Sequence, residues 1–497
     1  MSKPDADYRG ILKATSIIGG SAFVNILISM VRAKVVAVLL GPVGFGMLGM
    51  YTSLVSLITT ISGSGIGMSG VRQIAEAHGT GDQKKVSRTV SILRKTVWGT
   101  GILGTCLVIL LSPLLAYWSF EDHSYTLPIV FLSITVLLTN ISLGQTCIIQ
   151  GTRRLKDLAK INILGGINAT VIGIPCYFFW GIHGIVPALV IGGMATLVTS
   201  WYFARKIPVE KVDSNFREDR KQIYDLLQFG FPVMLTGVIS GLSAYLIRVM
   251  LIRMVTLDGV GLYQAAFALS GVLVNFVLSA MGTDYYPRLT AIASDNEQLG
   301  KEVNAQTLIA LFLAVPALAA TIIFAPLGMK ILYTAKFSVA ADILRWSVFG
   351  VFGRVISWPL GYVILAKGRG KTYFYTELLA NIAIFVLTLI CTKKWGLVGT
   401  GIAFPIAYFF YTVIVYTVFY QLSGKKWSDS VIYHVIAFLL LLILVGFAAI
   451  LKINMIFYWV INLSLLILIS TYCMFQLSNK IGISMDSIKR KLFKNGR

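Results

Sequence analysis

The sequence predicts an all-α protein that crosses a membrane many times. Hydrophobic residues make up 56% of the 497 residues and charged residues only 13%, whereas soluble domains carry about 25% charged residues. Apolar runs of about 20 residues recur along the whole chain, and each is long enough to cross a bilayer core of about 30 Å. The first run has no small-residue cleavage site, which favours a retained helix over a signal peptide.

The apolar runs and the breaks between them predict fourteen helices. These helices start near residues 16, 43, 97, 127, 161, 184, 226, 259, 304, 341, 373, 396, 430 and 455. Most of the 43 Lys and Arg residues fall in segments that join the helices on one side of the membrane. The opposite side holds only Lys330, Lys336, Lys393, Lys394 and Lys452.

This asymmetry predicts the orientation of the chain. Short cytoplasmic segments of membrane proteins carry an excess of Lys and Arg, so both termini are expected in the cytoplasm. Most of the net charge of +22 is then explained by the cytoplasmic segments that set the orientation of the chain. It predicts attraction to anionic membrane lipids, and not nucleic-acid binding.

The sequence also favours a chain built of two related halves. Similar segments recur at an offset of about 216 residues, the signature of an internal repeat. "WGIHGIVPALV" from Trp180 matches "WGLVGTGIAFP" from Trp395, and "GFGMLGMY" follows the first helix as "GVGLYQAA" follows the seventh. The loop pairs "GVRQIAEA" with "YPRLTAIA" and "GTRRLK" with "KGRGKT" keep similar offsets.

A duplication of six helices predicts two pseudo-symmetric lobes with the same orientation, related by an axis along the membrane normal. The predicted organisation is an N-lobe at 1–205, a cytoplasmic linker at 206–225, a C-lobe at 226–422, and an appendage at 423–497. The appendage holds the last two helices and a basic cytoplasmic tail.

Motifs for enzymatic or nucleotide chemistry carry little weight here. "GIGMSG" (65–70) follows a membrane helix instead of opening a βαβ unit, so its glycines are expected to serve close helix packing. "GKT" (370–372) lacks the first glycine of a phosphate-binding loop. The cysteines and histidines show no metal-ligand spacing or catalytic arrangement. We therefore predict a transporter, not an enzyme, with no cofactor and no metal.

Six cations interrupt the apolar runs. A cation at the centre of a membrane helix costs about 2.5 to 3.5 kcal/mol, so such residues usually face protein or a wet cavity. Lys34 lies about 10 Å from the outer end of its helix and can snorkel. Arg253 and Arg345 are expected near the interface. The deeper cations, predicted to face one shared cavity, are Arg32, Arg248 and Arg354.

Arg32 and Lys34 are two residues apart, which is about 200° around a helix. They cannot point the same way, and Arg32 is expected to face inward. Glu377 and Asp284 are the acids found in or bordering the spans, and they are too few to neutralise the cations. Because an unpaired buried charge is costly, the cavity is predicted to be hydrated and to hold an anion. Arginine suits phosphate, since its planar fork makes paired hydrogen bonds.

The sequence resembles Wzx-type O-antigen and oligosaccharide flippases, in the polysaccharide transporter family of the MOP superfamily. The resemblance rests on "RAKVVAVLLGPVGFGMLGMY", "GVRQIAEAHGTGD", "TDYYPRLTA" and "WPLGYVILAKGRGKTYFYTEL". It covers the first twelve helices and implies two six-helix lobes in a V around a cationic cavity. It also implies transfer of an undecaprenyl-pyrophosphate-linked oligosaccharide across a bacterial inner membrane, with glycan polymerase and synthesis enzymes as partners.

The resemblance implies roles for individual residues. Arg32, Arg248 and Arg354 become candidates for substrate binding, with Lys34 and Arg253 as weaker ones. The proposed gate or headgroup contacts are Arg72, Arg288, Asp284 and Glu377.

Alternative functions remain open. A flippase of the peptidoglycan lipid precursor shares the pyrophosphate. A multidrug exporter is disfavoured because organic cations require acids in the cavity, and Arg32 and Lys34 stand on the first helix where the drug-exporter branch often has an acid. A membrane-embedded glycosyltransferase is disfavoured because the outer loops are short.

Overall fold

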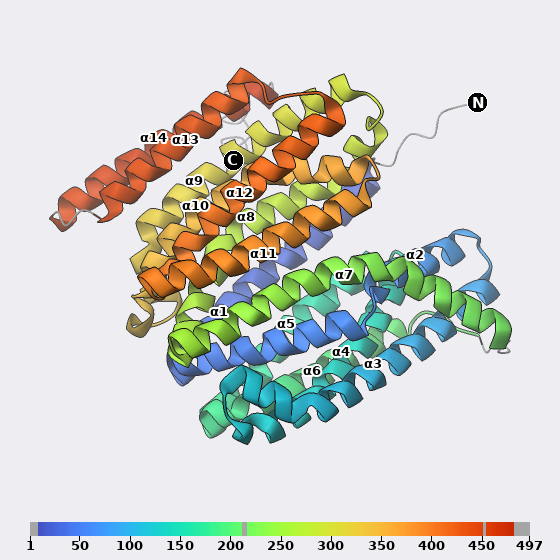
Figure 1. Ribbon diagram of the computed structural model, residues 1–497. Helices are drawn as coiled ribbons and strands as arrows, with labels where there is room; N and C mark the ends of the chain where they lie inside the picture. Colours follow the sequence, from blue (N-terminus) through green and yellow to red (C-terminus); the bar gives the residue numbers. More distant parts are fainter. Residues whose placement is uncertain (1–7, 211–215, 451–453, 482–497) are drawn as a thin grey trace, which may run out of the picture. The chain divides into compact units, whose positions relative to one another are not determined.

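The computed structural model describes residues 8–210, 216–450 and 454–481, and this part of the chain is helical without a strand (Figure 1). The predicted all-α membrane fold is confirmed. Eleven helices or merged helix pairs among the described residues are long and apolar enough to cross a membrane. Helices suit this environment because their backbone hydrogen bonds close within the segment.

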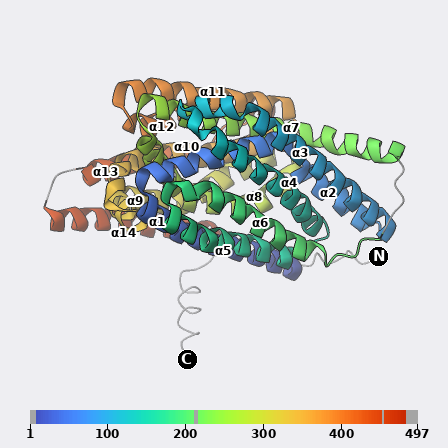
Figure 2. The same ribbon diagram turned by 90° about the horizontal axis from the view of Figure 1, so that it is seen from below.

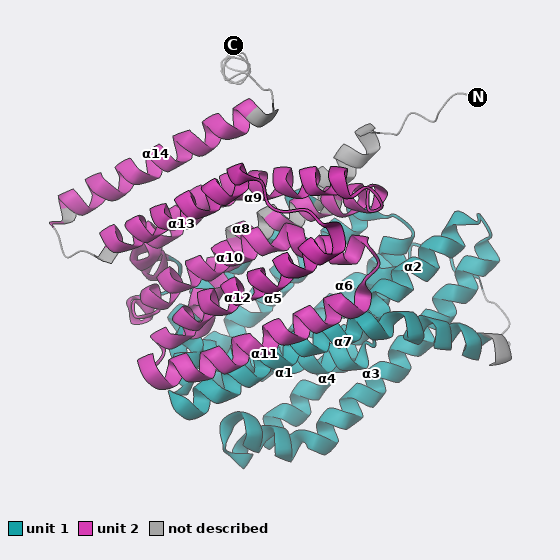
Figure 3. Cartoon of the chain, turned by 45° about the horizontal axis from the view of Figure 1, so that its top comes forward, with its two compact units in different colours: residues 1–262, 332–334 teal, residues 263–331, 335–497 magenta. Residues whose placement is uncertain are grey.

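The chain forms two compact units (Figure 3). Unit 1 comprises 1–262 and 332–334, and unit 2 comprises 263–331 and 335–497. Unit 1 contains the first turn of α8 together with α1 (Tyr8–Ser62), α2 (Ile66–Gly79), α3 (Gln83–Phe120), α4 (Thr126–Gly151), α5 (Leu155–Trp180), α6 (Ile185–Ala204) and α7 (Phe216–Met254). The rest of α8 (Leu257–Ala291) lies in unit 2 with α9 (Asn296–Leu332), α10 (Ala340–Ala366), α11 (Gly370–Trp395), α12 (Val398–Ser423), α13 (Asp429–Ile450) and α14 (Met455–Ile481). The lobe boundaries expected from the repeat stay a prediction.

Helix α1 contains two of the predicted spans. Its helical geometry breaks at Gly41, where φ is 65° and ψ is −168°. Side-chain-bearing residues essentially never adopt this conformation, and Pro42 follows without an N–H to continue the ladder. The break therefore separates the helices predicted to start near residues 16 and 43.

The segment after this break makes a reciprocal contact with the start of α8, within unit 1. A Cβ on Gly46 would overlap the carbonyl oxygen of Leu257, and a Cβ on Gly261 would overlap that of Pro42. Gly46 and Gly261 are equivalent positions of the predicted repeat. Only glycine allows the two backbones to approach so closely.

The predicted helix starts near residues 97, 226 and 304 were wrong. Helix α3 begins at Gln83, α7 is already helical at Phe216, and α9 begins at Asn296. The segment predicted as a loop also forms α2. Its apolar residues recur every three or four positions, typical of an amphipathic helix, and Ile74, Val90 and Leu93 are fully buried. A search for long apolar runs misses such helices. Figures 1 and 2 both show α2 beside α3, and α5 beside α6.

Unit 2 has a continuous apolar core. Fully buried side chains of α9 and α10, such as Leu311, Val315 and Phe352, pack with Leu442 and Val445 of α13. Tyr458 and Trp459 of α14 also pack against this core. The two helices of the predicted appendage are thus integral to the packing of unit 2.

Candidate functional site

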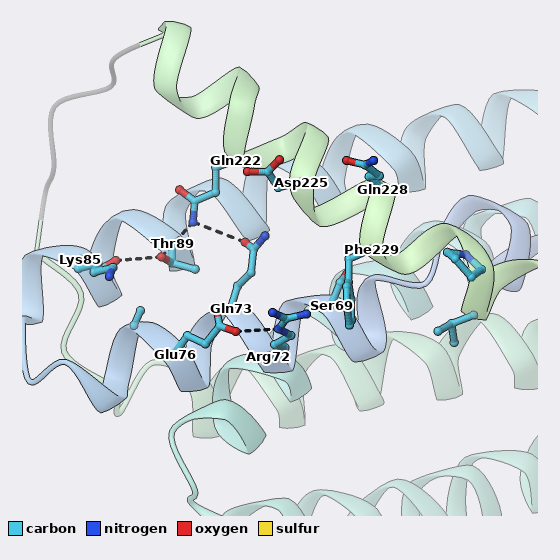
Figure 4. A pocket seen from close by; sticks show the side chains of 13 residues that line it. Ser69, Arg72, Gln73, Glu76, Lys85, Thr89, Gln222, Asp225, Gln228 and Phe229 are labelled. Atoms are coloured by element: carbon cyan, nitrogen blue, oxygen red, sulfur yellow. Dashed lines mark hydrogen bonds and ion pairs between the residues drawn. The ribbon is translucent and has the colours of Figure 1, made fainter. Parts of the chain in front are cut away.

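Unit 1 contains a polar pocket of about 780 Å³ between α2, the first turns of α3 and the first turns of α7 (Figure 4). We call it the polar pocket of unit 1. The pocket is lined by Ser69, Arg72, Gln73, Glu76, Ala77, Lys85, Thr89, Gln222, Asp225, Gln228, Phe229, Pro232 and Val233.

The helical repeat places these side chains on facing surfaces. Ser69, Arg72 and Glu76 recur at three- and four-residue spacing along α2, and so share one face. Ile66 and Ile74 of the same helix are fully buried. The register of α2 is set at Gly65, which has a φ of 70° and abuts Gly230 of α7. This contact confirms that the "GIGMSG" glycines serve close packing.

Hydrogen bonds join the three helices across the pocket. The Gln222 side-chain amide of α7 donates to Thr89 Oγ1 of α3 at 3.1 Å and to Gln73 Oε1 of α2 at 3.5 Å. Figure 4 shows these amides and the Thr89 hydroxyl converging on one rim. Amides and hydroxyls both donate and accept, which matches the hydroxyl groups of a sugar.

Arg72 lies on the opposite rim, between an acid and an aromatic ring. Its Nε donates to Glu76 Oε1 at 2.7 Å, and its guanidinium carbon lies 4.4 Å from the Phe229 ring centroid. The Arg72 side chain is half exposed (54%), so its remaining N–H groups are open to a ligand from solvent. Arg72 and Lys85 supply cations to a pocket that also holds acids, which fits a ligand with phosphate and hydroxyl groups.

A buried acid beside the pocket was missed by sequence reasoning. Asp219 of α7 is 11% exposed in its side chain and lies 3.3 Å from an Arg88 nitrogen and 3.2 Å from Lys95 Nζ. Both cations belong to α3. The pairing spans more than a hundred residues of sequence, and no local pattern indicates it.

A pair of substitutions separates binding by Arg72 from a structural role. We expect Arg72→Gln to lower transport about three- to tenfold, because a neutral hydrogen bond, weaker by about 1 kcal/mol, replaces the charge-assisted hydrogen bond to the ligand. Glu76→Gln is expected to retain transport, because it removes only the carboxylate that competes with a ligand for the Arg72 guanidinium. Vesicle-based transport or glycan export in cells measures both. Equal losses in the two variants would assign Arg72 to the ion pair alone.

Among the predicted cavity cations of unit 1, Arg32 and Lys34 have separate surroundings. Arg32 lies half-buried, about 14 Å along the helix from the break at Gly41, within electrostatic range of the Tyr177 hydroxyl on α5. No acid pairs with it in the described residues. Lys34 Nζ instead donates to the backbone carbonyl of Tyr333.

The α7 cations lie closer to a helix end. Arg248 donates to the Ala244 carbonyl of its own helix at 2.8 Å, about 9 Å from the last residue of α7. Arg253 pairs with Glu121 at 3.3 Å and donates to the Trp118 carbonyl at 3.2 Å. Arg253 thus forms an ion pair at the end of its helix.

In unit 2, Arg354 lies about 20 Å along α10 from either helix end. It is half-buried, within electrostatic range of the Tyr408 hydroxyl on α12, and no acid pairs with it in the part of the chain that is described. Glu377 on α11 accepts a hydrogen bond from Tyr411 at 2.7 Å. Arg345, expected near the interface, pairs with Asp342 at 3.2 Å at the start of α10.

The second predicted gate arginine lies in an acidic setting. Arg288 pairs with Asp284 one turn earlier at 2.8 Å and with Glu302 of α9 at 2.7 Å. Arg288 and Asp284, both predicted as gate or headgroup contacts, are therefore brought together. The convergence of Arg32, Arg248 and Arg354 on one cavity stays a prediction.

The fold and these side chains can be set against known proteins. A sequence model described as "Polysaccharide biosynthesis protein" matches residues 11–293, more than half of the chain. The chain belongs to this family. The Lipid III flippase of Escherichia coli (strain K12) is 21% identical over 418 residues, covering 81% of this chain and 96% of the flippase. Stage V sporulation protein B of Bacillus subtilis (strain 168) is 22% identical over 282 residues, 54% of each chain.

Solved structures show the same fold. The Lipid II flippase MurJ in an inward closed conformation has a TM-score of 0.71 and 13% identity, covering 95% of this chain and 99% of MurJ. An inward-facing MATE family multidrug transporter of the MOP superfamily has a TM-score of 0.68 and 14% identity, covering 80% of this chain and 95% of the transporter. The resemblance seen in the sequence is confirmed for the family and the fold, and its O-antigen specificity stays a prediction.

Proposed function

We propose that the protein is a flippase that moves an undecaprenyl-pyrophosphate-linked oligosaccharide, an O-antigen or related surface-glycan unit, from the cytoplasmic to the periplasmic leaflet of a bacterial inner membrane. The observation that carries this proposal is the pair Arg32 and Arg354, two arginines within apolar spans whose charge no acid in the described chain offsets. A cation in such a place is costly unless it serves a ligand or a wet cavity. The likeness to a lipid III flippase over 81% of this chain supports a lipid-linked anionic substrate.

In this mechanism, the arginines hold the pyrophosphate through paired hydrogen bonds to its oxygens. The polar pocket of unit 1 would admit the sugar hydroxyls from the cytoplasmic side. The prenyl chain stays in lipid, so only the polar headgroup is carried through protein. Alternating access then exchanges the side of the membrane to which the headgroup is open.

Alanine substitution of the three arginines predicted to face the cavity tests this proposal. We expect Arg32→Ala, Arg248→Ala and Arg354→Ala each to lower glycan export about ten- to hundredfold. Each variant loses one charge-assisted hydrogen bond to the pyrophosphate, which contributes about 1.5 to 3 kcal/mol. The amount of protein in the membrane should not change. Lys301→Gln removes an equally charged group whose side chain is 75% exposed, and it should export normally. Full export by all three arginine variants would refute the site.

A second candidate is a flippase of the peptidoglycan lipid precursor, which the TM-score of 0.71 with the Lipid II flippase MurJ favours. Deletion of the gene separates the two. A surface-glycan flippase should leave wall synthesis intact, and the lipid-linked glycan that accumulates identifies the substrate. Accumulation of the wall precursor would replace the first proposal by the second.

A further inference from the structure

A second pocket of unit 1, of about 430 Å³, lies between α3, α4 and α6. Its lining is mostly apolar and aromatic, with Trp98 of α3 and Trp201 of α6 both about half exposed. Two polar side chains also line it, Arg94 of α3 and Gln145 of α4. None of these residues belongs to the polar pocket of Figure 4.

Each of these two polar side chains has one buried atom without a hydrogen bond among the residues that the structure describes. Gln145 is 5% exposed, and its Oε1 is buried without a hydrogen bond among the described residues. The Nε of Arg94 is likewise buried and unbonded within the described chain. Buried polar groups are nearly always satisfied, and leaving one unpaired costs about 1 to 3 kcal/mol. A ligand that supplies an acceptor to Arg94 and a donor to Gln145 would satisfy both.

The position of the pocket indicates where such a ligand comes from. Trp201 lies in the last turn of α6, and Gln145 lies about 9 Å from the end of α4. Two cations follow each of these helix ends, Arg205 and Lys206 after α6, and Arg153 and Arg154 after α4. Arg205 lies 5.1 Å from the Trp201 ring centroid, and Lys206 lies 4.5 Å from the Tyr202 ring centroid. Tryptophan and tyrosine gather at the headgroup level of a bilayer, and nearby cations attract anionic lipid.

We propose that this pocket binds the headgroup of an anionic glycerophospholipid of the cytoplasmic leaflet. The phosphodiester accepts hydrogen bonds from Arg94, a headgroup hydroxyl donates to Gln145 Oε1, and the acyl chains lie along Trp98 and Val198. Phosphatidylglycerol has this combination of acceptor and donor. The site is separate from the proposed transport path, so it stands or falls independently of the transported substrate.

Brominated lipids test the proposal, because bromine quenches tryptophan fluorescence only at short range. The full-length protein is placed in nanodiscs whose lipid includes a tenth of brominated phosphatidylglycerol, or of brominated phosphatidylcholine. We expect quenching by the phosphatidylglycerol to be at least twofold stronger. Arg94→Gln should abolish this preference, whereas Lys84→Gln, an exposed cation on the same helix outside the pocket, should keep it.

Gln145→Leu separates binding from folding. Replacing an unsatisfied buried amide by an apolar group of similar size should leave thermal stability in detergent unchanged or raised, yet lower the lipid preference. Equal quenching by both lipids in the unaltered protein, or an unchanged preference in Arg94→Gln and Gln145→Leu, would overturn the proposal. Competition by millimolar soluble glycerol phosphate would mean that a free anion, and not a lipid, is the ligand.

Discussion

Gly65→Ala is expected to destabilise unit 1 by about 3 kcal/mol and to abolish transport. Gly65 has a φ of 70°, a left-handed conformation that costs a side-chain-bearing residue about 1 to 2 kcal/mol. The new methyl group would also overlap the carbonyl oxygen of Gly230. Relieving that overlap moves α2 away from α7, and overpacking of this kind costs about 1 to 3 kcal/mol more.

Gly81 provides the matched control. It has a φ of 72°, and a Cβ there would meet nothing within 4 Å. Gly81→Ala should therefore show the conformational cost alone, about 1 to 2 kcal/mol, with transport retained. Thermal unfolding in detergent and glycan export together measure the difference. Equal behaviour of the two variants would show that the backbone contact at Gly65 has no role.

Asp219→Asn is expected to produce the second large effect. The substitution replaces the buried carboxylate by a neutral amide. Arg88 and Lys95 of α3 both pair with that carboxylate, so both lose the negative charge that they share. Breaking a fully buried ion pair costs about 3 to 5 kcal/mol. Because the Lys95 side chain is 53% exposed and screened by water, we expect about 1 to 3 kcal/mol here. The lost pairing should loosen α7 from α3 and impair transport.

Asp225 on the same helix supplies the control. It lines the pocket, is exposed, and makes no hydrogen bond or ion pair within the described residues, so Asp225→Asn should have little effect on stability. A double-mutant cycle with Lys95→Gln measures the coupling directly. A coupling energy near zero, or equal losses in Asp219→Asn and Asp225→Asn, would contradict the proposed pairing.

Much of the fold was predictable because lipid imposes a simple rule on sequence. Each long apolar run must become a helix, so the spans and the last two helices follow from composition alone. The amphipathic α2 and the first turns of α3 were missed for the converse reason. Their apolar residues, such as Ile74 and Val90, form a buried stripe instead of a continuous run.

The candidate site was only partly predictable. Arg32 and Arg354 could be singled out because charge is conspicuous in an apolar segment. Arg94 could not, since the misplaced start of α3 assigned it to a loop whose cations set topology. The pairings of Asp219 with Lys95 and of Glu377 with Tyr411 join separate helices. Such contacts depend on packing, which a single sequence does not reveal.

The glycine contact near the start of α8 bears on the origin of the chain. Gly46 meets Leu257 while Gly261 meets Pro42, and the same offset relates Gly46 to Gly261 and Pro42 to Leu257. In a homodimer, this exchange of identical contacts marks an isologous interface on a two-fold axis. The reciprocal contact is therefore what a duplication of six helices implies at the seam between its copies, and the duplication itself stays a prediction.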